Sequence, residues 1–513
     1  TTATLGPYND TSISRSANLN VKRRFNFFPF PFALQAGGVR TDFRADTRTN
    51  SLTFNYNGPD GDPATPDSPE PFLMQNYRNM DSFYGFKNVP WTSAKGAYVA
   101  YVANPRLFSQ TPAQVVATEN SRRSASEYVQ EVVSALYMQA EARLMNNRLN
   151  LLTGVRFEKT TDQGEGSLFD ANAVFVRNAD GTFARTATGA RIRKPAAGAV
   201  GSMEELLLTR QERAFKNKRS YDGYFPSLHM TYNIKDNFQA RLAYAKTYGR
   251  PGYSDIIPNA TFSERDLSEA DFNNPDVIKG TVTIRNTALR PWTADNYDLS
   301  VEYYTQSGGV VSGGLFLKEI KDFFGTRVIV AKLEGLEAVG LDPRYVNWNL
   351  STKFNSGNAR ITGAEFNVRQ SLRNLGAWGN PFTVFANGTK LELAGQNQAD
   401  FTSFIPKRAN WGVSFSRQQI TLIAKWNYRG LDKRGGQPAY GPDAFEYITA
   451  RTQLDLNGAY QFNKRFSLNV TVSNALNVPQ TLLRYESETP AYARQFQESE
   501  FAIAFAVAVK GSF

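Results

Sequence analysis

The last thirteen residues of the chain, 501–513, alternate strictly between two kinds of side chain. Successive side chains of a β-strand point to opposite faces of a sheet, so this alternation predicts a strand. One face carries Phe501, Ile503, Phe505, Val507, Val509, Gly511 and Phe513, and the other carries alanines with Lys510 and Ser512. A soluble protein gains little by ending on an exposed aromatic residue. The pattern therefore favours a barrel wall in which the earlier strands meet this last strand around a ring.

Composition narrows the classes of protein to consider. The chain has 513 residues, no Cys and a single His, which excludes disulfides and thiolate metal sites and argues against a His-based centre. No run of about 18 apolar residues exists, so no transmembrane helix is expected, whereas barrel strands are only half apolar. The net charge of +11 indicates a preference for anionic surfaces, without a nucleic-acid-binding motif. The sequence begins at Thr1 without a signal peptide, so we expect a processed or incomplete N-terminus.

Alternation of apolar and polar residues recurs along the chain in about fifteen segments. They are 18–27, 33–56, 129–144, 149–158, 224–233, 238–248, 296–304, 310–321, 360–371, 382–393, 410–416, 421–428, 454–462, 466–474 and 501–513. A helix competes at 129–144, because Glu, Ala, Met and Leu favour helices. The Asn146-Asn147 turn and the partner segment that follows it favour a hairpin.

The connections between these segments alternate between short turns and long loops. The long loops begin at Gly58, Asp162, Gly249 and Phe324 and follow Leu393, Arg429 and Asn474. Soluble sandwiches and lipocalins also alternate along each strand, but they lack this asymmetry of connections. Outer-membrane barrels have short periplasmic turns and long extracellular loops. We therefore expect the long loops to face the exterior.

Charges of both signs lie on the polar face of nearly every segment, which suits a wet lumen. The predicted lumen-facing set is Arg24, Arg40, Asp42, Glu141, Arg143, Arg156, Arg241, Asp298, Glu302, Glu365, Arg369, Lys425 and Asp455. Aromatic residues gather near the segment ends, as the girdles at a membrane interface require. In a bilayer the strands must also close, so that no backbone group is left unpaired. The sequence thus predicts an all-β fold, a transmembrane antiparallel β-barrel.

Several segments resemble a known family. The segment NTALRPWTADNYDL, 286–299, resembles the N-x-x-L-x-P-E-x-x-x-N-Y segment of TonB-dependent outer-membrane receptors, with Trp292 in place of the usual Glu. YFPSLHMTYNIKDNFQARLAYAKTYGRP (224–251), ITGAEFNV (361–368) and NVTVSNALN (469–477) are similar to barrel repeats of that family, as is the terminal aromatic residue. The resemblance implies a barrel of 22 strands with a plug domain inside it and an N-terminal TonB box. Neither plug nor box is recognisable, so we expect residues 1–513 to supply strands 8–22, with the missing parts upstream.

The resemblance also implies partners and a location. These are the bacterial outer membrane and its lipid, the TonB–ExbB–ExbD energy-coupling complex, and the barrel assembly machinery, which would recognise the last strand ending at Phe513. No cofactor and no nucleic-acid partner are implied. An enzyme is not expected, because His229 is the single candidate base and a hydrogen-bonded wall residue is the plainer assignment for it.

Substrate contacts are expected at or beyond the predicted outer rim. The candidates are Tyr84, Trp91, Tyr248, Arg250, Tyr253, Arg434 and Tyr440. Aromatic rings give flat contact area at low entropy cost, and Arg binds carboxylate or catecholate oxygens, which suits an anionic ferric siderophore. Rings also stack on sugars, so oligosaccharide uptake stays an alternative, as do a passive porin and a surface-binding barrel that uses the basic loop 191–219. Packing within loops or the interfacial girdle is the plainer explanation for each candidate.

Overall fold

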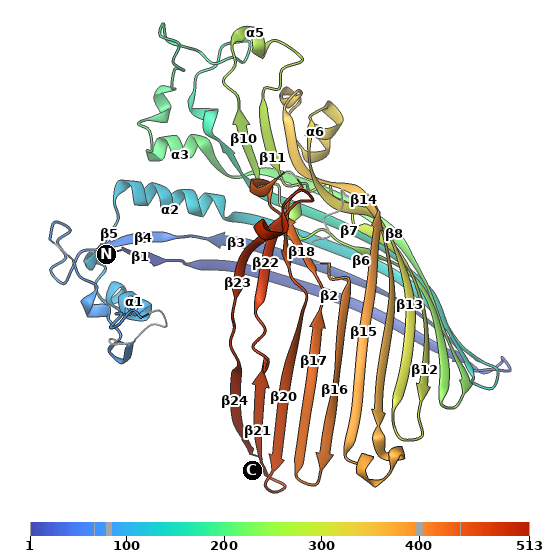
Figure 1. Ribbon diagram of the computed structural model, residues 1–513. Coiled ribbons are helices and arrows are strands. Elements are labelled where there is room, and N and C mark those ends of the chain that lie inside the picture. Colours follow the sequence, from blue (N-terminus) through green and yellow to red (C-terminus); the bar gives the residue numbers. More distant parts are fainter. Residues whose placement is uncertain (1, 66, 78–84, 396–403, 442, 512–513) are drawn as a thin grey trace.

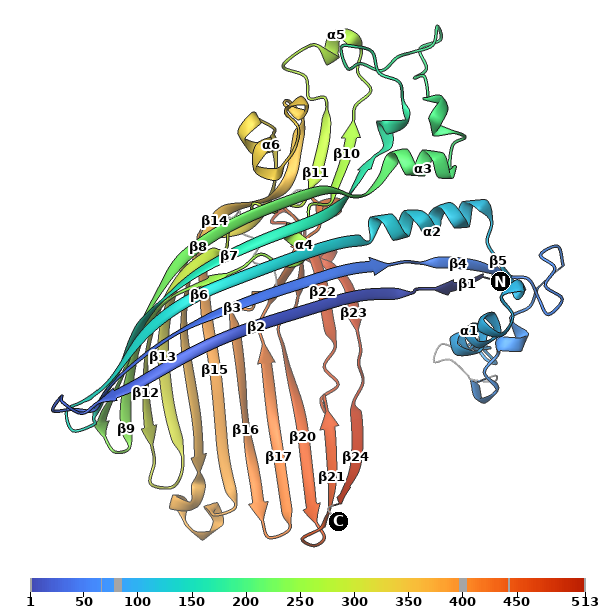
Figure 2. The same cartoon turned by 180° about the vertical axis from the view of Figure 1, so that it is seen from behind.

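Long antiparallel strands, joined in chain order, build one curved wall (Figures 1 and 2). The computed structural model describes every residue except 1, 66, 78–84, 396–403, 442 and 512–513. In the described part, successive pairings join β2 (Tyr8–Phe25), β3 (Phe32–Thr49), β6 (Ser126–Leu144), β7 (Leu149–Asp170), β8 (Arg210–Lys235), β9 (Phe238–Gly249), β12 (Trp292–Tyr304), β13 (Val310–Val330), β14 (Asn349–Ser371), β15 (Phe382–Gly395), β16 (Lys407–Arg417), β17 (Ile420–Arg429), β20 (Arg451–Gln461), β21 (Phe466–Ser473) and β24 (Ala504–Gly511). The predicted all-β antiparallel architecture is confirmed.

The wall is an open arc over the described residues. There, β2 pairs with β3 alone and β24 pairs with β21 alone. Short turns lie at the end of the wall near the C-terminus, and the connections that carry α3 (Met203–Thr209), α5 (Glu269–Phe272) and α6 (Leu333–Val339) lie at the opposite end (Figure 1). This is the polarity that the connection lengths predict. No helix of the described chain is long and apolar enough to cross a membrane.

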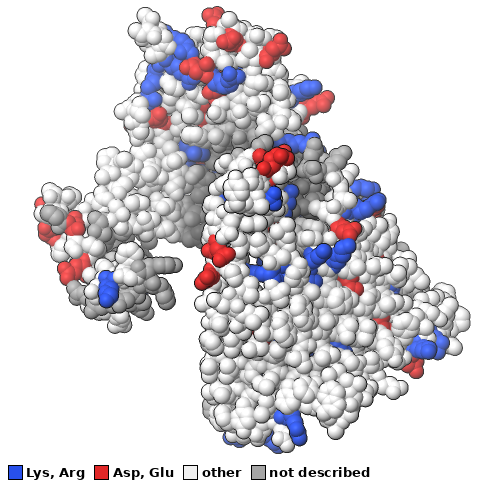
Figure 3. Space-filling view, in the orientation of Figure 1, with Lys and Arg blue, Asp and Glu red and all other residues white. Residues whose placement is uncertain are grey.

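One face of the wall, here called the outer face, is apolar and uncovered. Leu19 and Leu136 flank Gly38 in the strand register and are 70% and 66% exposed. On β24, Phe505 and Val507 are similarly exposed. Figure 3 shows few charged side chains over the lower parts of β16–β24. Large apolar side chains with no layer over them are what a lipid-facing wall requires.

The opposite, inner face is polar. Lys22 Nζ lies 2.9 Å from Glu141 Oε2, and the Tyr137 hydroxyl donates to Asn20 Oδ1 at 2.7 Å. Further along the wall, Asn427 Nδ2 donates to Asp455 Oδ2 at 2.7 Å. The first two contacts reach from β2 to β6 over the intervening β3, and the third joins the adjacent strands β17 and β20. All three lie on the face that the sequence predicts to be wet.

The register corrects the predicted orientation of Arg40 and Asp42. Phe43 lies opposite Glu131 on the inner face, so Arg40 and Asp42 alternate onto the outer face. There Arg40 Nη1 donates to Ser134 Oγ at 3.2 Å, and Asp42 accepts from Arg44 Nη2 at 2.8 Å. Arg40 and Asp42 lie beyond the apolar rows of the outer face, where this face also meets water. Polarity therefore does not tell the outer face from the inner face at this position. The predicted lumen-facing orientation of Arg40 and Asp42 was wrong.

Several predicted segment ends also differ from the structure. The first wall strand begins at Tyr8, ten residues before the predicted start at 18, and the predicted strand 33–56 is divided into β3 and β4 (Leu52–Tyr56). Strands β7 and β8 extend well into the predicted loop from Asp162 to 220. Most residues of these extensions are polar, although Leu168 and Phe215 pack against the core of the loops above, so no regular alternation reveals the extensions. The competing helix at 129–144 was wrong, since this stretch lies within β6.

The last strand is shorter than predicted. Its described part is β24, and Ala502 just before it has a left-handed φ of 58°, which interrupts the alternation from Phe501 onward. The end of the predicted strand, including Phe513, lies outside the described residues.

Some of the predicted long loops form a packed cap at this end of the wall, which the sequence pattern does not reveal. A hairpin of β10 (Ala260–Glu264) and β11 (Gly280–Ile284) pairs in parallel with the upper ends of β7 and β14. Its core, shared with α6, is built from Ala260, Phe262, Val282, Ile284, Ala331, Leu336, Val339, Leu341, Tyr345, Trp348 and Leu350. The cap is thereby held to the wall at two separate strands.

Two smaller units complete the exterior end. β1 (Thr2–Leu5), β4 and β5 (Phe108–Ser109) form a sheet packed by α1 (Ala94–Ala103), with α2 (Pro112–Ser124) leading back to β6. β18 (Asp432–Gly436), β19 (Phe445–Ile448), β22 (Gln480–Tyr485) and β23 (Gln495–Ser499) form a four-stranded sheet above the C-terminal strands.

Candidate functional site

The segment between β9 and β10, residues 250–259, folds back onto the inner face of the wall, and we call it the strap. It contains α4 (Tyr253–Ile256). Ile256 and Ile257 are buried against Val129 of β6 and Phe43 of β3. The strap therefore lies across the inside of the mouth, over strands that belong to a distant part of the sequence.

Two glycines of β7 allow this close approach. A Cβ on Gly164 would lie 2.9 Å from the Ile256 carbonyl oxygen and 2.9 Å from Pro258 Cδ. A Cβ on Gly166 would lie 2.7 Å from the backbone nitrogen of Asn259. Real side chains do not tolerate such contacts with backbone. The small residues at these places thus let the strap dock directly onto strand β7.

Arg250 anchors the start of the strap by pairing with two carboxylates of the wall. Its Nη1 lies 3.3 Å from Glu131 Oε1, and its Nη2 forms a short ion pair with Glu158. Nη2 also donates to the Tyr248 hydroxyl at 2.8 Å. The Glu158 side chain is buried and that of Glu131 is 11% exposed. Burial of Arg250 opposes its charge, but the hydrogen bond to Glu158 and the charges of both carboxylates raise its pKa overall. The guanidinium is therefore neutralised in place.

Tyr253 covers the same carboxylate from above. Its ring stacks on Phe43 with centroids 5.1 Å apart, and its hydroxyl donates to Glu131 Oε1 at 3.3 Å. Burial, followed by the negative charge of Glu131, raises the pKa of Tyr253 to about 12. The hydroxyl thus stays protonated at neutral pH and remains a donor, while one ring edge remains exposed.

The far part of the strap is held by further polar contacts. Lys353 Nζ of β14 lies 2.8 Å from Asp255 Oδ1, and Thr287 Oγ1 donates to the Ile256 carbonyl at 2.5 Å. Asn259 Oδ1 accepts from the backbone nitrogen of Ser167 at 2.7 Å. The strap is therefore fastened to β7 on one side and to β14 on the other.

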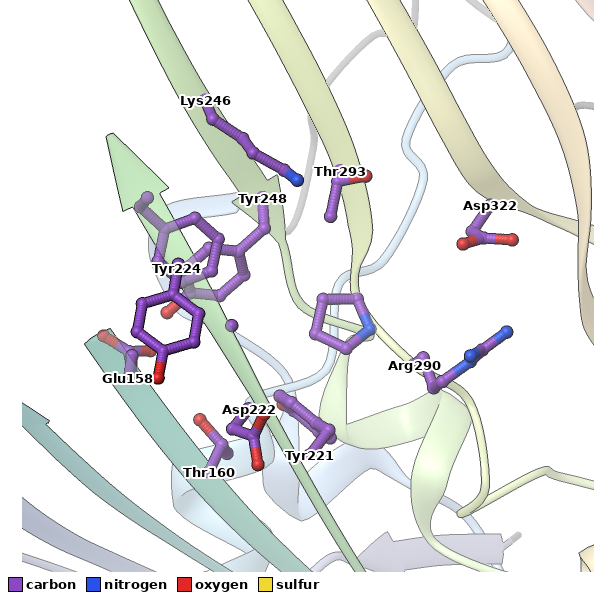
Figure 4. A pocket seen from close by; sticks show the side chains of 13 residues that line it. Glu158, Thr160, Tyr221, Asp222, Tyr224, Lys246, Tyr248, Arg290, Thr293 and Asp322 are labelled. Carbon is purple, nitrogen blue, oxygen red and sulfur yellow. The ribbon is translucent and has the colours of Figure 1, made fainter. Parts of the chain in front are cut away.

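A polar pocket of about 220 Å³ opens beside this network (Figure 4). It lies where β8 separates from β9, because their described pairing ends at Ser227 and Ala245. The pocket is lined by Glu158, Thr160, Tyr221, Asp222, Gly223, Tyr224, Phe225, Lys246, Tyr248, Arg290, Pro291, Thr293 and Asp322. Inner-face residues such as Glu158 and outer-face residues such as Tyr224 meet there. Thr160 is 1% exposed.

The pocket combines acceptors, hydroxyls and aromatic faces. Carboxylates of Glu158, Asp222 and Asp322 outnumber the two cations, Lys246 and Arg290. Glu158 is already paired with Arg156 and Arg250, so the charges left to the pocket balance. Such a set accepts hydrogen bonds from a hydroxyl-rich ligand. No group of three or more Asp, Glu or His side chains in the described chain is placed to hold a metal ion.

The structure brings only part of the predicted substrate set together. Tyr248, Arg250 and Tyr253 form the network just described, at the inner side of the mouth. Arg434 and Tyr440 belong to the separate four-stranded sheet, where the Tyr440 hydroxyl accepts from Arg484 Nη1 at 3.4 Å. Arg434 lies 3.5 Å from buried Asp432.

The remaining two candidates are not placed in this network. Trp91 is exposed in the loop before α1, where its carbonyl accepts from the backbone nitrogen of Met74 at 2.8 Å. Tyr84 lies outside the described residues. The outer rim therefore offers three separate groups of candidates, and no described contact joins them.

Sequence reasoning missed the carboxylates that complete the site. Glu131 and Glu158 are inner-face residues of β6 and β7, and neither is among the predicted lumen-facing residues. A usable signal exists in hindsight, since Gly164 and Gly166 in strand β7 mark close approach of another backbone.

The wall is curved, with an apolar outer face, a polar inner face and a strap across the mouth. These features are those of a receptor barrel. The TonB-dependent receptor-like β-barrel family matches residues 1–475, and the chain belongs to that family. A comparison with curated proteins found no significant match.

Solved structures with a similar fold share little sequence with this chain. The ferric citrate transporter FecA in its unliganded form matches with a TM-score of 0.54 at 11% identity, over 99% of this chain and 55% of that one. The closed form of the ferric-catecholate import receptor Fiu from E. coli K12 matches with a TM-score of 0.54 at 12% identity, over 98% and 55%. FpvAI, in a complex with pyocin S2, matches with a TM-score of 0.50 at 13% identity, over 99% and 50%. The chain thus spans about half the length of these structures, and the likeness concerns the fold.

Proposed function

We propose that this chain is part of an outer-membrane receptor that imports a scarce, large solute with energy supplied through TonB–ExbB–ExbD. The observation that carries the proposal is the strap, fastened to β7 and β14 across the inner face of a wall whose outer face is apolar. A passive porin needs an open mouth, and here the strap and the cap occupy the exterior end. The surrounding lipid, the coupling complex and the assembly machinery are partners in this proposal.

A ferric siderophore is the substrate that we propose first. Tyr248, Arg250 and Tyr253 gather within hydrogen-bond reach of one another or of Glu131. The two hydrogen bonds that Glu131 accepts, from Arg250 and Tyr253, are long at 3.3 Å each and therefore weak. An anionic oxygen of the ligand can displace Glu131 from these two donors. Ferric citrate and ferric catecholates are the cargoes named for two receptors of similar fold. We also propose that four residues of the outer loops contact the substrate, namely Tyr84, Trp91, Arg434 and Tyr440.

Oligosaccharide uptake is the second candidate, and the pocket between β8 and β9 favours it. In this pocket, sugar hydroxyls donate to Asp222 or Asp322, and sugar rings stack on Tyr224. A pocket of about 220 Å³ holds one monosaccharide unit and leaves the rest of a chain outside.

The test is uptake by iron-starved cells that carry the intact gene or a deletion. The probes are ferric citrate and a ferric tris-catecholate labelled with radioactive iron, and labelled maltoheptaose. We expect iron uptake to need the gene and to stop when a protonophore collapses the proton-motive force. Replacement of Tyr253 by Ala should slow it about tenfold, roughly the value of two lost contacts, while Tyr98→Ala on exposed α1 serves as the matched control.

The outcomes separate the candidates. Uptake that persists with the protonophore indicates a passive channel and overturns the proposal. Gene-dependent uptake of maltoheptaose without uptake of either iron complex replaces the siderophore by a glycan. A Tyr253→Ala variant that transports iron at the normal rate removes the strap from the substrate site.

A further inference from the structure

Asp162 of β7 is a buried carboxyl group next to the place where the strap docks. Its residue is 2% exposed, and no ion pair joins it to a cation of the described chain. The next inner-face residue of β7 toward the exterior is Gly164, against which Ile256 and Pro258 of the strap lie. The docked strap therefore helps to keep water away from this carboxyl group.

Asp162 also faces a second carboxylate. In the antiparallel register Glu131 of β6 lies directly opposite it. Side chains in such opposed positions are about 5 Å apart, and like charges there repel each other. Arg250 of the strap pairs with Glu131 and Glu158, and Glu158 also pairs with Arg156. Three carboxylates thus share two cations, and Asp162 is the carboxylate without a partner of its own.

The remaining groups around Asp162 do not supply a compensating charge. Tyr221 of β8 and Tyr253 of the strap carry neutral hydroxyls, because burial raises the pKa of both side chains above its ordinary value. Arg219 lies opposite Asp162 on β8, but its side chain is exposed and forms no ion pair with a described residue. A negative charge on Asp162 is therefore costly while the strap is docked.

This environment favours the protonated form of Asp162. Burial, followed by the charge of Glu131, raises the pKa of Asp162 from 3.8 to about 6, and Tyr221 and Arg250 offset only part of this change. The residue stands beyond the apolar rows, since its outer-face neighbours on β7 are Thr161 and Gln163. A carboxyl pKa that is raised in the docked state destabilises docking above pH 6, and this cost disappears as the pH falls toward 3.8.

We propose that Asp162 is a proton-binding site that sets how firmly the strap is held. A proton on Asp162 removes its repulsion with Glu131 and leaves Arg250 to the other two carboxylates. Loss of the proton restores the repulsion, and lifting the strap then lets water reach the charged group. Acid therefore tightens the strap and neutral pH loosens it. The inference rests on the docked strap and not on the proposed substrate or energy source.

The experiment measures hydrogen exchange in the strap of the intact receptor in nanodiscs at pH 7.5 and pH 5. Each rate is divided by the rate of an unstructured peptide at the same pH, which removes the intrinsic effect of pH on exchange. The reporters are the amides of Ile257 and Asn259, both bonded within the strap. We expect their protection to be about tenfold greater at pH 5, because the carboxyl pKa is about 6 under the docked strap and 3.8 in water. Peptides from β16 and β17 should show no change in protection.

Two variants separate the charge of Asp162 from its shape. Asp162→Asn keeps nearly the same shape without a charge, so at pH 7.5 its strap should be protected as well as the wild-type strap is at pH 5, with no further gain on acidification. Glu165→Gln is the matched control, because Glu165 is also on β7 but alternates onto the opposite face, where it lies 3.2 Å from Lys216 Nζ. This control should keep the full response to pH.

Three results would overturn the proton site. They are equal strap protection at the two pH values in the wild type, a pH response that persists in Asp162→Asn, and weaker strap protection in Asp162→Asn at pH 7.5, which would indicate a structural role only. The wild-type comparison needs no substitution, so it decides the question even if a variant folds poorly. A receptor that shows this pH response and imports no iron complex would refute the proposed function alone.

Discussion

Gly164 of β7 offers the sharpest test of how the strap is held. A Cβ at this position would lie 2.9 Å from the Ile256 carbonyl oxygen, 2.9 Å from Pro258 Cδ and 3.2 Å from Ile257 Cα. Backbone and a proline ring cannot rotate aside as a flexible side chain can. The substitution Gly164→Ala must therefore either strain the contact or lift the strap from the wall.

The magnitudes decide between these two responses. Overpacking by a single methyl group costs about 1–3 kcal/mol. Lifting the strap would expose Ile256 and Ile257, each worth about 2 kcal/mol of burial, and would also break the contacts of Arg250 and Lys353. Strain is the smaller cost. We therefore expect the strap to stay docked but to open more often.

Hydrogen exchange measures this opening directly. The amide of Ile257 is bonded to the Tyr253 carbonyl at 3.1 Å, and that of Asn259 to the Ile257 carbonyl at 2.8 Å. A loss of about 1–3 kcal/mol in local stability speeds their exchange by roughly 5- to 150-fold, since each 1.4 kcal/mol is a factor of ten. Peptides from β13 and β14 should keep their wild-type exchange.

Gly435→Ala is the control, because a Cβ there meets nothing within 4 Å and the residue lies in the separate sheet of β18. If peptides covering 253–259 exchange at the wild-type rate in the Gly164→Ala variant, the close contact does not exist and the docked strap is refuted. If Gly435→Ala gives the same acceleration, the effect is general and tells nothing about the strap.

Two further predictions concern charged groups outside the apolar band. Arg250→Met leaves Glu131 with the Tyr253 hydroxyl and Glu158 with Arg156, and should lower the free energy of unfolding by about 2 kcal/mol. Adding Glu131→Gln should recover part of this loss. An unchanged denaturation midpoint would contradict the pairing. In α2, hydrogen bonds from Arg122 and then Arg123 lower the pKa of Glu119 from 4.5 to about 2. A depressed carboxyl pKa stabilises the fold above pH 4.5, and this stabilisation is lost as the pH falls toward 2. Because the arginines are partly exposed, the ion pairs are worth little. We therefore expect the free energy of unfolding of Glu119→Gln to be only about 1 kcal/mol below that of the wild type at pH 6, and equal to it near pH 2. Chemical unfolding of both proteins at the two pH values measures this difference.

The sequence predicts the wall well where lipid constrains it. Leu136 and Met138 alternate with Tyr137 and Gln139, because one face meets hydrocarbon and the other meets water, and this part of β6 was located correctly. Where β6 continues toward the exterior, both faces are wet. Local alternation then has no physical cause, and side chains such as Arg40 are assigned to the wrong face.

The candidate site was predictable only in part, for a different reason. Tyr253 and Arg250 could be placed near the rim from the end of β9, but their partners come from β3, β6 and β7, more than 90 residues earlier in the chain. Contacts at that separation depend on the register and on how the strap folds back. Neither is encoded in a local pattern, apart from the glycines that permit the approach.

The neutralised state of Arg250 gives the strap a function that an unpaired cation would not have. A free guanidinium at the mouth would attract any anion, whereas this one is available only to a ligand oxygen that binds it more strongly than Glu131 does. An anionic ligand that takes Nη1 leaves Glu131 with only the Tyr253 hydroxyl, and so weakens the contact between the strap and β6. We therefore propose that ligand binding and strap release are coupled through Glu131. Glu131→Gln should remove most of that coupling, with the strap exchanging equally fast with and without the ferric complex, while Glu158 still holds Arg250 in place.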